Sequence, residues 1–325
     1  MKVGLCSYNF VRALSSGALS VEEMFRIFRD WGASHVEISD FTLPVYEGDM
    51  PARLKEWSEQ YGIEIAGLNF GSDIANLTGD AYKEELEKLY YKLDVAHQIG
   101  ATSSRIDMVR QIGKRRADQT KKDLIHWADG TIVGGTEDFE KVFEGIVRAA
   151  KDLCDYNAQY GNPVLSENHG ILFNGADRMK RVYLAVDKKN YGITMDVGNA
   201  LCVGEDPLVM VEELLPIIRR VHFKDFYVRG AEEALAIGTE DSEGNRLKEE
   251  GTIAYSGWLT SRYGDYLRGA IVGQGDVPVQ LIVDKILDSD YDKDGNGHLS
   301  VEFEGIEDCF LGSRLGLRTL KNLVG

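Results

Sequence analysis

The chain has 325 residues, of which 43% are hydrophobic and 28% charged, a composition typical of globular proteins that excludes a disordered or fibrous one. Its formal net charge of −16 argues against nucleic acid as the main partner, because binding to phosphates usually needs a basic surface. The length fits one α/β barrel with insertions as well as two average domains.

Short strand-like segments alternate with helix-like segments along the first half of the chain. A strand is expected at residues 3–8, and the helix after it begins with a capping pair, Ser20 and Glu23. Trp31 lies on the apolar stripe of that helix and is expected in the core. The pattern then predicts strands at 35–38, 64–69 and 103–108, and helices at 53–61, 82–99 and 138–156.

The second half repeats this alternation. It predicts strands at 163–167, 192–196, 221–225 and 298–303, and helices at 177–186, 207–217, 279–287 and 314–322. Eight strand–helix units without a linker between them predict an α/β fold with one domain over residues 1–325, a single (β/α)8 TIM barrel.

Two connections are too long for simple turns, one at about residues 109–135 after the fourth strand and one at about residues 226–277 after the seventh. Both follow strands and so lie on the C-terminal face, where barrel active sites are built. The first begins with a basic cluster, for which a solvated surface is the alternative to a functional role. Its Trp127, like Trp258 in the second, could stack on a sugar ring or fill an interface.

The second connection is expected to close over the barrel mouth or to pack against another subunit. The reason is that it carries more aromatic surface than a free loop should leave in water: Tyr227, Trp258, Tyr263 and Tyr266.

Cysteine usage and hydropathy indicate a cytoplasmic protein. The four cysteines are scattered without a C-x-x-C spacing: Cys6, Cys154, Cys202 and Cys309. Met1 leads into a strand-like segment rather than a signal sequence. No run approaches the roughly 18 apolar residues that a transmembrane helix needs, so we expect no membrane partner.

Ligand-type side chains stand at the ends of the last four predicted strands: Glu167, Asp196, His222 and Glu302. Consecutive strand ends lie side by side around one barrel mouth, so these residues are expected to meet. In the eighth strand, alternation directs Ser300 and Glu302 inward and Val301 toward the helices. Three carboxylates and one imidazole suit one divalent ion, with Mn²⁺ expected first and Mg²⁺, Co²⁺ or Zn²⁺ as alternatives.

The strand-end motifs resemble those of the xylose-isomerase-like barrels. They read ENHG (167–170), MDVGN (195–199), VHFKD (221–225), VGQGD (272–276) and LSVEFEG (299–305). That superfamily includes sugar-phosphate isomerase/epimerase-like proteins, ketose 3-epimerases, inosose dehydratases, an AP-endonuclease branch and the catalytic subunits of C-glycoside deglycosidases. The resemblance implies that Glu167, Asp196, His222 and Glu302 are the metal ligands, and that Glu167 and Glu302 also act as acid/base groups on opposite faces of a substrate.

Further polar residues are candidates for catalysis and substrate binding. His169, two residues after Glu167, is a candidate base, with a hydrogen-bonding role beside a ligand as the alternative. The candidate contacts to substrate hydroxyls are Lys224, Arg105, Asp107, Glu37 and Arg268. For Arg105 and Glu37, an ion pair inside the barrel is the alternative.

Residues 292–300 also resemble the start of an EF-hand calcium loop, with Asp292, Asp294 and Asn296 at the first ligand positions. Position 12, which should be a bidentate glutamate, is Phe303. Residues 299–303 alternate like a strand, whereas an EF-hand needs a helix there. We therefore interpret this segment as the turn into the eighth strand.

Three enzymatic functions remain open, and a non-enzymatic binding barrel is the fourth alternative. The first is isomerisation or epimerisation of a sugar, keto-sugar or cyclitol by proton abstraction next to a metal-bound carbonyl. The second is lyase chemistry on the same kind of substrate, either dehydration or C-glycoside deglycosylation. A phosphodiesterase of the AP-endonuclease type is disfavoured by the net charge and the single ligand set. We expect a carbohydrate substrate and a homo-oligomer, or a hetero-oligomer with a small second subunit for a deglycosidase.

Overall fold

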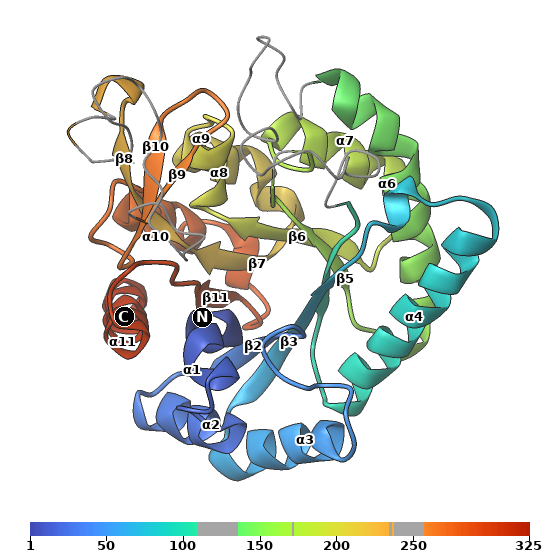
Figure 1. The fold of residues 1–325 in the computed structure, drawn as a ribbon, viewed down its shortest axis with the longest axis horizontal. Helices are drawn as coiled ribbons and strands as arrows, with labels where there is room; N and C mark the ends of the chain where they lie inside the picture. Colours follow the sequence, from blue (N-terminus) through green and yellow to red (C-terminus); the bar gives the residue numbers. More distant parts are fainter. Residues whose placement is uncertain (110–135, 171, 234–235, 237–256) are drawn as a thin grey trace.

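The computed structural model describes residues 1–109, 136–170, 172–233, 236 and 257–325. Eight parallel strands close into a barrel in the order β1-β11-β7-β6-β5-β4-β3-β2 (Figure 1). This confirms the predicted single (β/α)8 barrel. The barrel strands are β1 (Lys2–Cys6), β2 (His35–Ser39), β3 (Glu64–Gly71), β4 (Ser104–Asp107), β5 (Val164–Glu167), β6 (Tyr191–Asp196), β7 (Ile218–Phe223) and β11 (His298–Val301).

Helices surround the barrel (Figure 1). The long ones are α2 (Val21–Asp30), α3 (Met50–Tyr61), α4 (Gly79–Gln98), α6 (Thr136–Asn157), α7 (Ala176–Val186), α9 (Pro207–Leu214), α10 (Val279–Leu287) and α11 (Cys309–Val324). Shorter helical segments include η1 (Ser7–Phe10), α1 (Val11–Ser15) and α8 (Asn199–Cys202). The capping box of Ser20 and Glu23 begins α2 as predicted. Within the described residues, no helix has the length and apolarity needed to cross a membrane.

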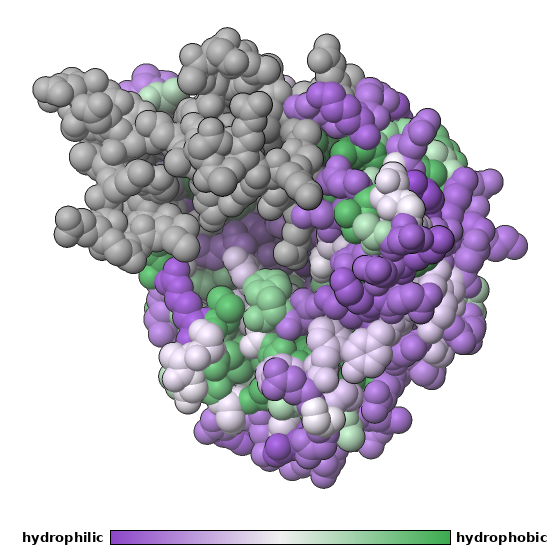
Figure 2. Space-filling view, turned by 45° about the vertical axis from the view of Figure 1, so that its right-hand side comes forward, coloured by the Kyte–Doolittle hydropathy of each residue, from purple (hydrophilic) through white to green (hydrophobic). Residues whose placement is uncertain are grey.

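The apolar core fills the layer between the strands and the helices, as β11 illustrates. Val301 is fully buried, and a side chain at Gly316 of α11 would lie 3.0 Å from its Cγ1 atom. A Cβ atom at Gly312 would lie 2.5 Å from Phe303 Cζ, so both helical glycines allow α11 to approach the barrel. The outer surface on the α4 and α6 side is mostly hydrophilic (Figure 2). The contact with Gly316 confirms the predicted orientation of Val301 toward the helices.

The barrel interior carries polar side chains in place of the usual branched apolar ones. Toward the N-terminal ends of the strands, His298 Nε2 lies 2.8 Å from Glu64 Oε1, and Arg220 donates to Thr102 Oγ1 at 2.8 Å. Both His298 and Arg220 are buried. Since an unpaired buried ion is very costly, these groups have to compensate one another.

Part of the connection after the seventh strand is a sheet, which sequence patterning did not predict. It contains the antiparallel strands β8 (Asp225–Arg229), β10 (Tyr266–Ala270) and β9 (Trp258–Thr260) in the order β8-β10-β9. Tyr266 is buried in it, whereas Tyr263 is 65% exposed. Residues 110–135, with Trp127 and the whole basic cluster, and residues 237–256 lie outside the described part of the chain. Closure of this connection over the mouth remains a prediction.

The predicted strand at residues 221–225 is wrong at its C-terminal end, because Asp225 redirects the chain out of the barrel. Its carboxylate accepts hydrogen bonds from four backbone N–H groups, those of Phe226 (2.8 Å), Gly273 (2.9 Å), Gly275 (2.9 Å) and Val277 (3.1 Å). A Cβ atom at Gly275 would lie 2.2 Å from Asp225 Oδ1, so only glycine fits there. The VHFKD and VGQGD motifs are therefore two halves of one structural unit.

The calcium-like segment is a turn into β11, as predicted. Asp292 Oδ1 accepts a hydrogen bond from the Gly297 N–H at 2.7 Å, and Oδ2 lies 2.7 Å from the N-terminal ammonium of Met1. The following residues form a strand rather than an exiting helix. Asp292 thus stabilises the turn and joins it to the start of the chain.

We predict that Asp225→Ala lowers the free energy of unfolding by about 2–4 kcal/mol, because four backbone donors lose an acceptor that is charged and largely buried. Chemical denaturation followed by circular dichroism measures this. Asp276→Ala is the matched control: the Asp276 side chain is 50% exposed and accepts from the Val228 N–H, so its loss should cost below about 1 kcal/mol. Equal losses in the two variants would contradict the anchoring role of Asp225.

Candidate metal centre and active site

The four predicted ligand residues meet at the C-terminal end of the barrel. Glu167 ends β5, Asp196 ends β6, His222 lies in β7 and Glu302 follows β11. One potential ligand atom from each lies within 4.8 Å of the other three, and all four residues are buried. The barrel topology therefore brings together residues that are far apart in the sequence.

The sequence around β5 and β6 fixes the position of Asp196. Asn168 accepts from the Asp196 N–H at 2.7 Å and donates to the Asp196 carbonyl at 2.8 Å, which ties the two strand ends together. Asp196 Oδ1 accepts from the N–H groups of Gly198 and Asn199, whereas Oδ2 faces Lys224. A Cβ atom at Gly198 would lie 2.7 Å from the Lys224 carbonyl oxygen, so glycine permits this turn.

Two buried cations offset the negative charge of the cluster. Lys224 Nζ lies 3.0 Å from Glu302 Oε1 and 3.2 Å from Asp196 Oδ2. Arg105 Nε lies 3.1 Å from Glu167 Oε2. Burial raises the pKa of Asp196 to about 6. Burial would also raise the pKa of Glu302, but Lys224 and His222 outweigh it and hold that pKa well below its ordinary value.

The cluster has the donor atoms and the unused bonding capacity of a divalent metal site. Glu167 Oε2, Asp196 Oδ2 and His222 Nδ1 are buried and make ion-pair contacts, but none forms a hydrogen bond of acceptable geometry. Buried polar atoms of this kind need a partner. Three carboxylate oxygens and one imidazole nitrogen are ligands that Mn²⁺, Zn²⁺, Co²⁺ and Mg²⁺ accept.

Glu37, expected to contact substrate, lies instead behind His222. It is 1% exposed, and its Oε2 lies 3.0 Å from His222 Nε2. His222 Nδ1, on the other side of the ring, lies 3.0 Å from Glu302 Oε2. Although burial lowers the pKa of His222, Glu37 outweighs it and raises that pKa well above the ordinary value. The structure thus favours the ion pair that was the alternative for Glu37.

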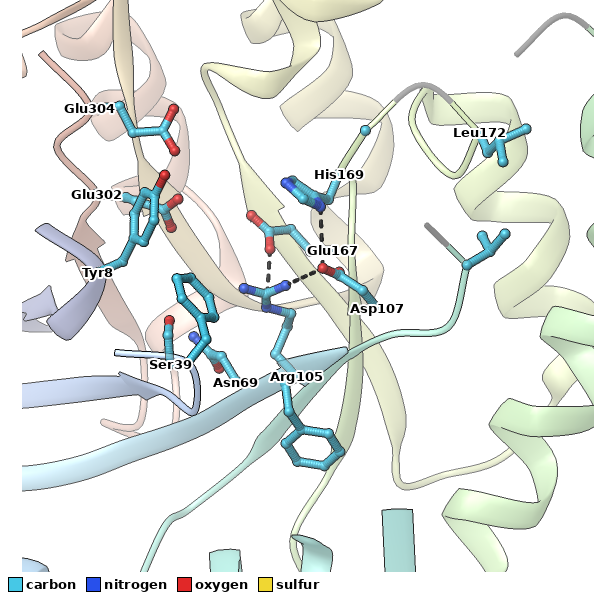
Figure 3. A pocket seen from close by; sticks show the side chains of 14 residues that line it. Tyr8, Ser39, Asn69, Arg105, Asp107, Glu167, His169, Leu172, Glu302 and Glu304 are labelled. Atoms are coloured by element: carbon cyan, nitrogen blue, oxygen red, sulfur yellow. Dashed lines mark ion pairs between the residues drawn. The ribbon is translucent and has the colours of Figure 1, made fainter. Parts of the chain in front are cut away.

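A cavity of about 580 Å³ opens beside the cluster. Tyr8, Glu302 and Glu304 lie on one side of it, and Arg105, Asp107, His169 and Glu167 lie on the other (Figure 3). The remaining lining is partly aromatic and apolar: Ser39, Phe41, Asn69, Phe70, Val109, Gly170 and Leu172. Such a mixture of rings and hydroxyl-binding groups suits a carbohydrate, whose ring has an apolar face.

Arg105, Asp107 and His169 form a chain of ion pairs leading to Glu167 (Figure 3). Asp107 Oδ2 lies 2.8 Å from Arg105 Nη1 and 3.2 Å from His169 Nδ1. Asp107 raises the pKa of His169 to about 9, and the His169 side chain is 51% exposed, so its proton can reach the cavity. His169 is therefore better suited to donate a proton than to accept one at neutral pH.

Like Glu37, two more of the expected substrate contacts do not line the cavity as far as the structure describes it. Lys224 is 3% exposed on its side chain and is engaged by Asp196, Glu302 and Glu304. Arg268 lies in β10, where its guanidinium packs over the rings of Tyr227 and Trp258. Arg105 and Asp107 do line it.

Sequence reasoning missed the contribution of the first three strands to the cavity, including Tyr8, Ser39 and Asn69. It also missed Glu304, which lies 3.4 Å from Lys224 Nζ. The signal was present: polar or aromatic residues follow β1 and β2 and lie in β3. However, these positions carry no group of metal-ligand residues, so in the sequence they resembled ordinary strand ends.

The curated relative that matches this chain is the inosose dehydratase of Geobacillus thermodenitrificans (strain NG80-2). The two are 25% identical over 179 residues, which cover 55% of this chain and 56% of that protein. The chain thus matches only about half the length of this relative.

Solved structures of similar fold cover the whole chain. D-psicose 3-epimerase with D-tagatose from Clostridium cellulolyticum H10 has a TM-score of 0.65 at 13% identity, over 100% of this chain and 99% of that one. The IOLI protein with a binding zinc atom also has a TM-score of 0.65, at 15% identity, over 100% of this chain and 96% of that one. At this identity they establish the fold alone.

A sequence model described as "Xylose isomerase-like TIM barrel" matches residues 25–321. This match runs from within α2 to within α11 and includes every ligand-type residue of the candidate metal centre. The chain therefore belongs to the xylose isomerase-like TIM barrel family.

Proposed function

We propose that this protein is a divalent-metal-dependent enzyme that removes a proton next to the carbonyl group of a sugar, keto-sugar or cyclitol. The observation that carries the proposal is the position of Glu167 and Glu302. Both belong to the four-residue cluster, and both also line the cavity. A carboxylate in both places can hold a metal and reach a bound substrate.

The metal, when bound, would polarise the substrate carbonyl and so make the adjacent C–H bond more acidic. The chain supplies the remaining functions. Glu167, held by Arg105, and Glu302, held by Lys224, face the cavity from different strands, as acid/base groups on opposite faces of a substrate would need to. Both cations are already paired with carboxylates of the protein, so neither is left over to bind an anionic group of a substrate. This favours an uncharged substrate.

Isomerisation or epimerisation is the first proposal for the reaction, and it needs only these two carboxylates. The similarity in fold to D-psicose 3-epimerase is consistent with it. Mn²⁺ is the metal proposed first, and the zinc in the IOLI protein makes Zn²⁺ the first alternative.

A lyase reaction is the second proposal, and His169 favours it. Loss of water requires a proton on the departing hydroxyl group, and His169 paired with Asp107 is a proton donor beside the cavity. The match to an inosose dehydratase agrees with this. If the reaction is C-glycoside deglycosylation, we expect a small partner subunit.

We predict that the purified protein binds one divalent ion per chain and that Glu302→Gln weakens this binding by about 10²-fold or more, because a charged ligand is lost. Isothermal titration with Mn²⁺ and Zn²⁺ after chelation measures the affinity. Glu304→Gln is the matched control, since Glu304 lies two residues away on the same wall but outside the cluster. Loss of binding in Asp294→Asn with normal binding in Glu302→Gln would instead indicate calcium-type binding by the turn before β11.

We predict that His169→Asn reduces turnover by roughly 10²-fold, the usual contribution of a general acid or base, while metal affinity stays unchanged. Steady-state kinetics and metal titration on the same preparation test this. His97→Asn is a control, because His97 stacks on Tyr160 at the helical surface. Unchanged turnover with weakened metal binding would make His169 a support for the ligands.

We predict that the protein exchanges a substrate C–H for deuterium from D₂O, and that chelation abolishes the exchange. Mass spectrometry and NMR over a panel of ketoses, keto-inositols and 3-oxo-glycosides detect it. Recovery of an aldose or epimer selects the first reaction, and loss of water or release of an aglycone selects the second. Cleavage of abasic DNA without exchange on any sugar would overturn both.

A further inference from the structure

A chain of hydrogen bonds crosses the barrel interior from His35 to His222. His35 Nε2 lies 2.8 Å from Ser300 Oγ, Ser300 donates to Glu37 Oε1 at 2.5 Å, and Glu37 Oε2 lies 3.0 Å from His222 Nε2. All four side chains are at most 1% exposed. None of them except His222 belongs to the four-residue cluster.

The donor and acceptor of each hydrogen bond follow from the Glu37 carboxylate at the centre. Ionised Glu37 can only accept, so the Ser300 hydroxyl proton points to it, and His35 Nε2 has to donate to Ser300. By the same argument His222 donates through Nε2. Its Nδ1, which faces Glu167 and Glu302, is then the nitrogen available to a ligand.

We infer that Glu37 is a positioning residue that fixes the ring orientation and tautomer of His222 and strengthens it as a metal ligand, with Ser300 and His35 holding Glu37 in place. This inference rests on the metal site of the proposed function. A carboxylate that accepts the second N–H of a ligand histidine both orients the ring and increases its basicity.

Neighbouring residues hold the side chains of this hydrogen-bond chain in place. A Cβ atom at Gly4 of β1 would lie 2.6 Å from the His35 ring, so glycine leaves room for that side chain. Asn69 of β3 donates to Glu37 Oε2 at 3.3 Å, adding a further restraint. Side chains of β2, β3, β7 and β11 therefore take part in this hydrogen-bond chain.

The same barrel contains a matched control pair. Glu64 Oε1 lies 2.8 Å from His298 Nε2, but neither residue belongs to the ligand cluster. Glu37→Gln and Glu64→Gln each remove the charge from a glutamate paired with a buried histidine, and Glu64 differs in being 26% exposed and paired with Lys2 as well. A merely structural effect should therefore appear in both variants, and an effect on the metal only in the first.

Titration of the chelated protein with Zn²⁺ and Mn²⁺ is the test. We expect Glu37→Gln to weaken binding by about 10- to 100-fold and Glu37→Leu to weaken it more, because glutamine keeps an acceptor for Nε2–H and leucine does not. Glu64→Gln should bind within about twofold of wild type, since it alters no contact of the cluster. In the Zn²⁺-loaded wild type with ¹⁵N-labelled histidine, NMR should show His222 protonated on Nε2 and bound through Nδ1.

The outcomes separate this inference from the proposed function. Absence of metal binding in the wild type would refute the metal site itself. Normal binding in both wild type and Glu37→Gln would overturn the inference alone. Binding through Nε2, with loss of affinity in Cys6→Ala, would also overturn it, since Cys6, Glu37 and His222 form an alternative group of potential ligands. If Glu37→Gln does not fold, Ser300→Ala, which leaves the charge in place, should still weaken binding.

Discussion

Three carboxylates and one imidazole share a buried space in which their ligand atoms lie within 4.8 Å of one another. At about 4 Å, two like charges repel by about 4 kcal/mol at an effective dielectric constant of 20, so this cluster cannot exist without compensation. Lys224 and Arg105 supply positive charge from the sides, and Glu37 supports His222 from behind. The polar barrel interior follows from this requirement, because each charged group brought inside needs its own partner.

The rest of the fold keeps these groups at fixed distances. The apolar outer faces of the strands pack against the helices, and glycines such as Gly316 let α11 approach closely enough to hold β11 rigid. Where β7 ends, the carboxylate of Asp225 binds four backbone N–H groups and directs the chain away from the barrel one residue after Lys224. That departure leaves Lys224 as the last side chain of the strand end and keeps its ammonium among the ligands.

The cavity combines two chemically different sides around this cluster. Tyr8 and Glu304 lie beside Glu302, whereas His169 and Asp107 lie near Glu167. Under the proposed function, a substrate bound between them would meet a carboxylate on each face, as isomerisation and epimerisation need. His169, if it acts as a proton donor, would add what the loss of a hydroxyl group needs. The same arrangement is therefore compatible with both of the proposed reactions.

The sequence by itself determined the barrel, because alternating strand and helix periodicity is a local property of each segment. Strand parity also placed Ser300 and Glu302 inside, and the order of the strand ends identified the four residues that meet. Only the tertiary structure showed that Glu37, 185 residues from His222, contacts that histidine instead of lining the cavity. It also decided that Arg268 packs between aromatic rings and that residues after β7 form a sheet. Periodicity reports which face of a strand is buried, but the partner of a buried charge is set by strands that are adjacent in space and distant in sequence.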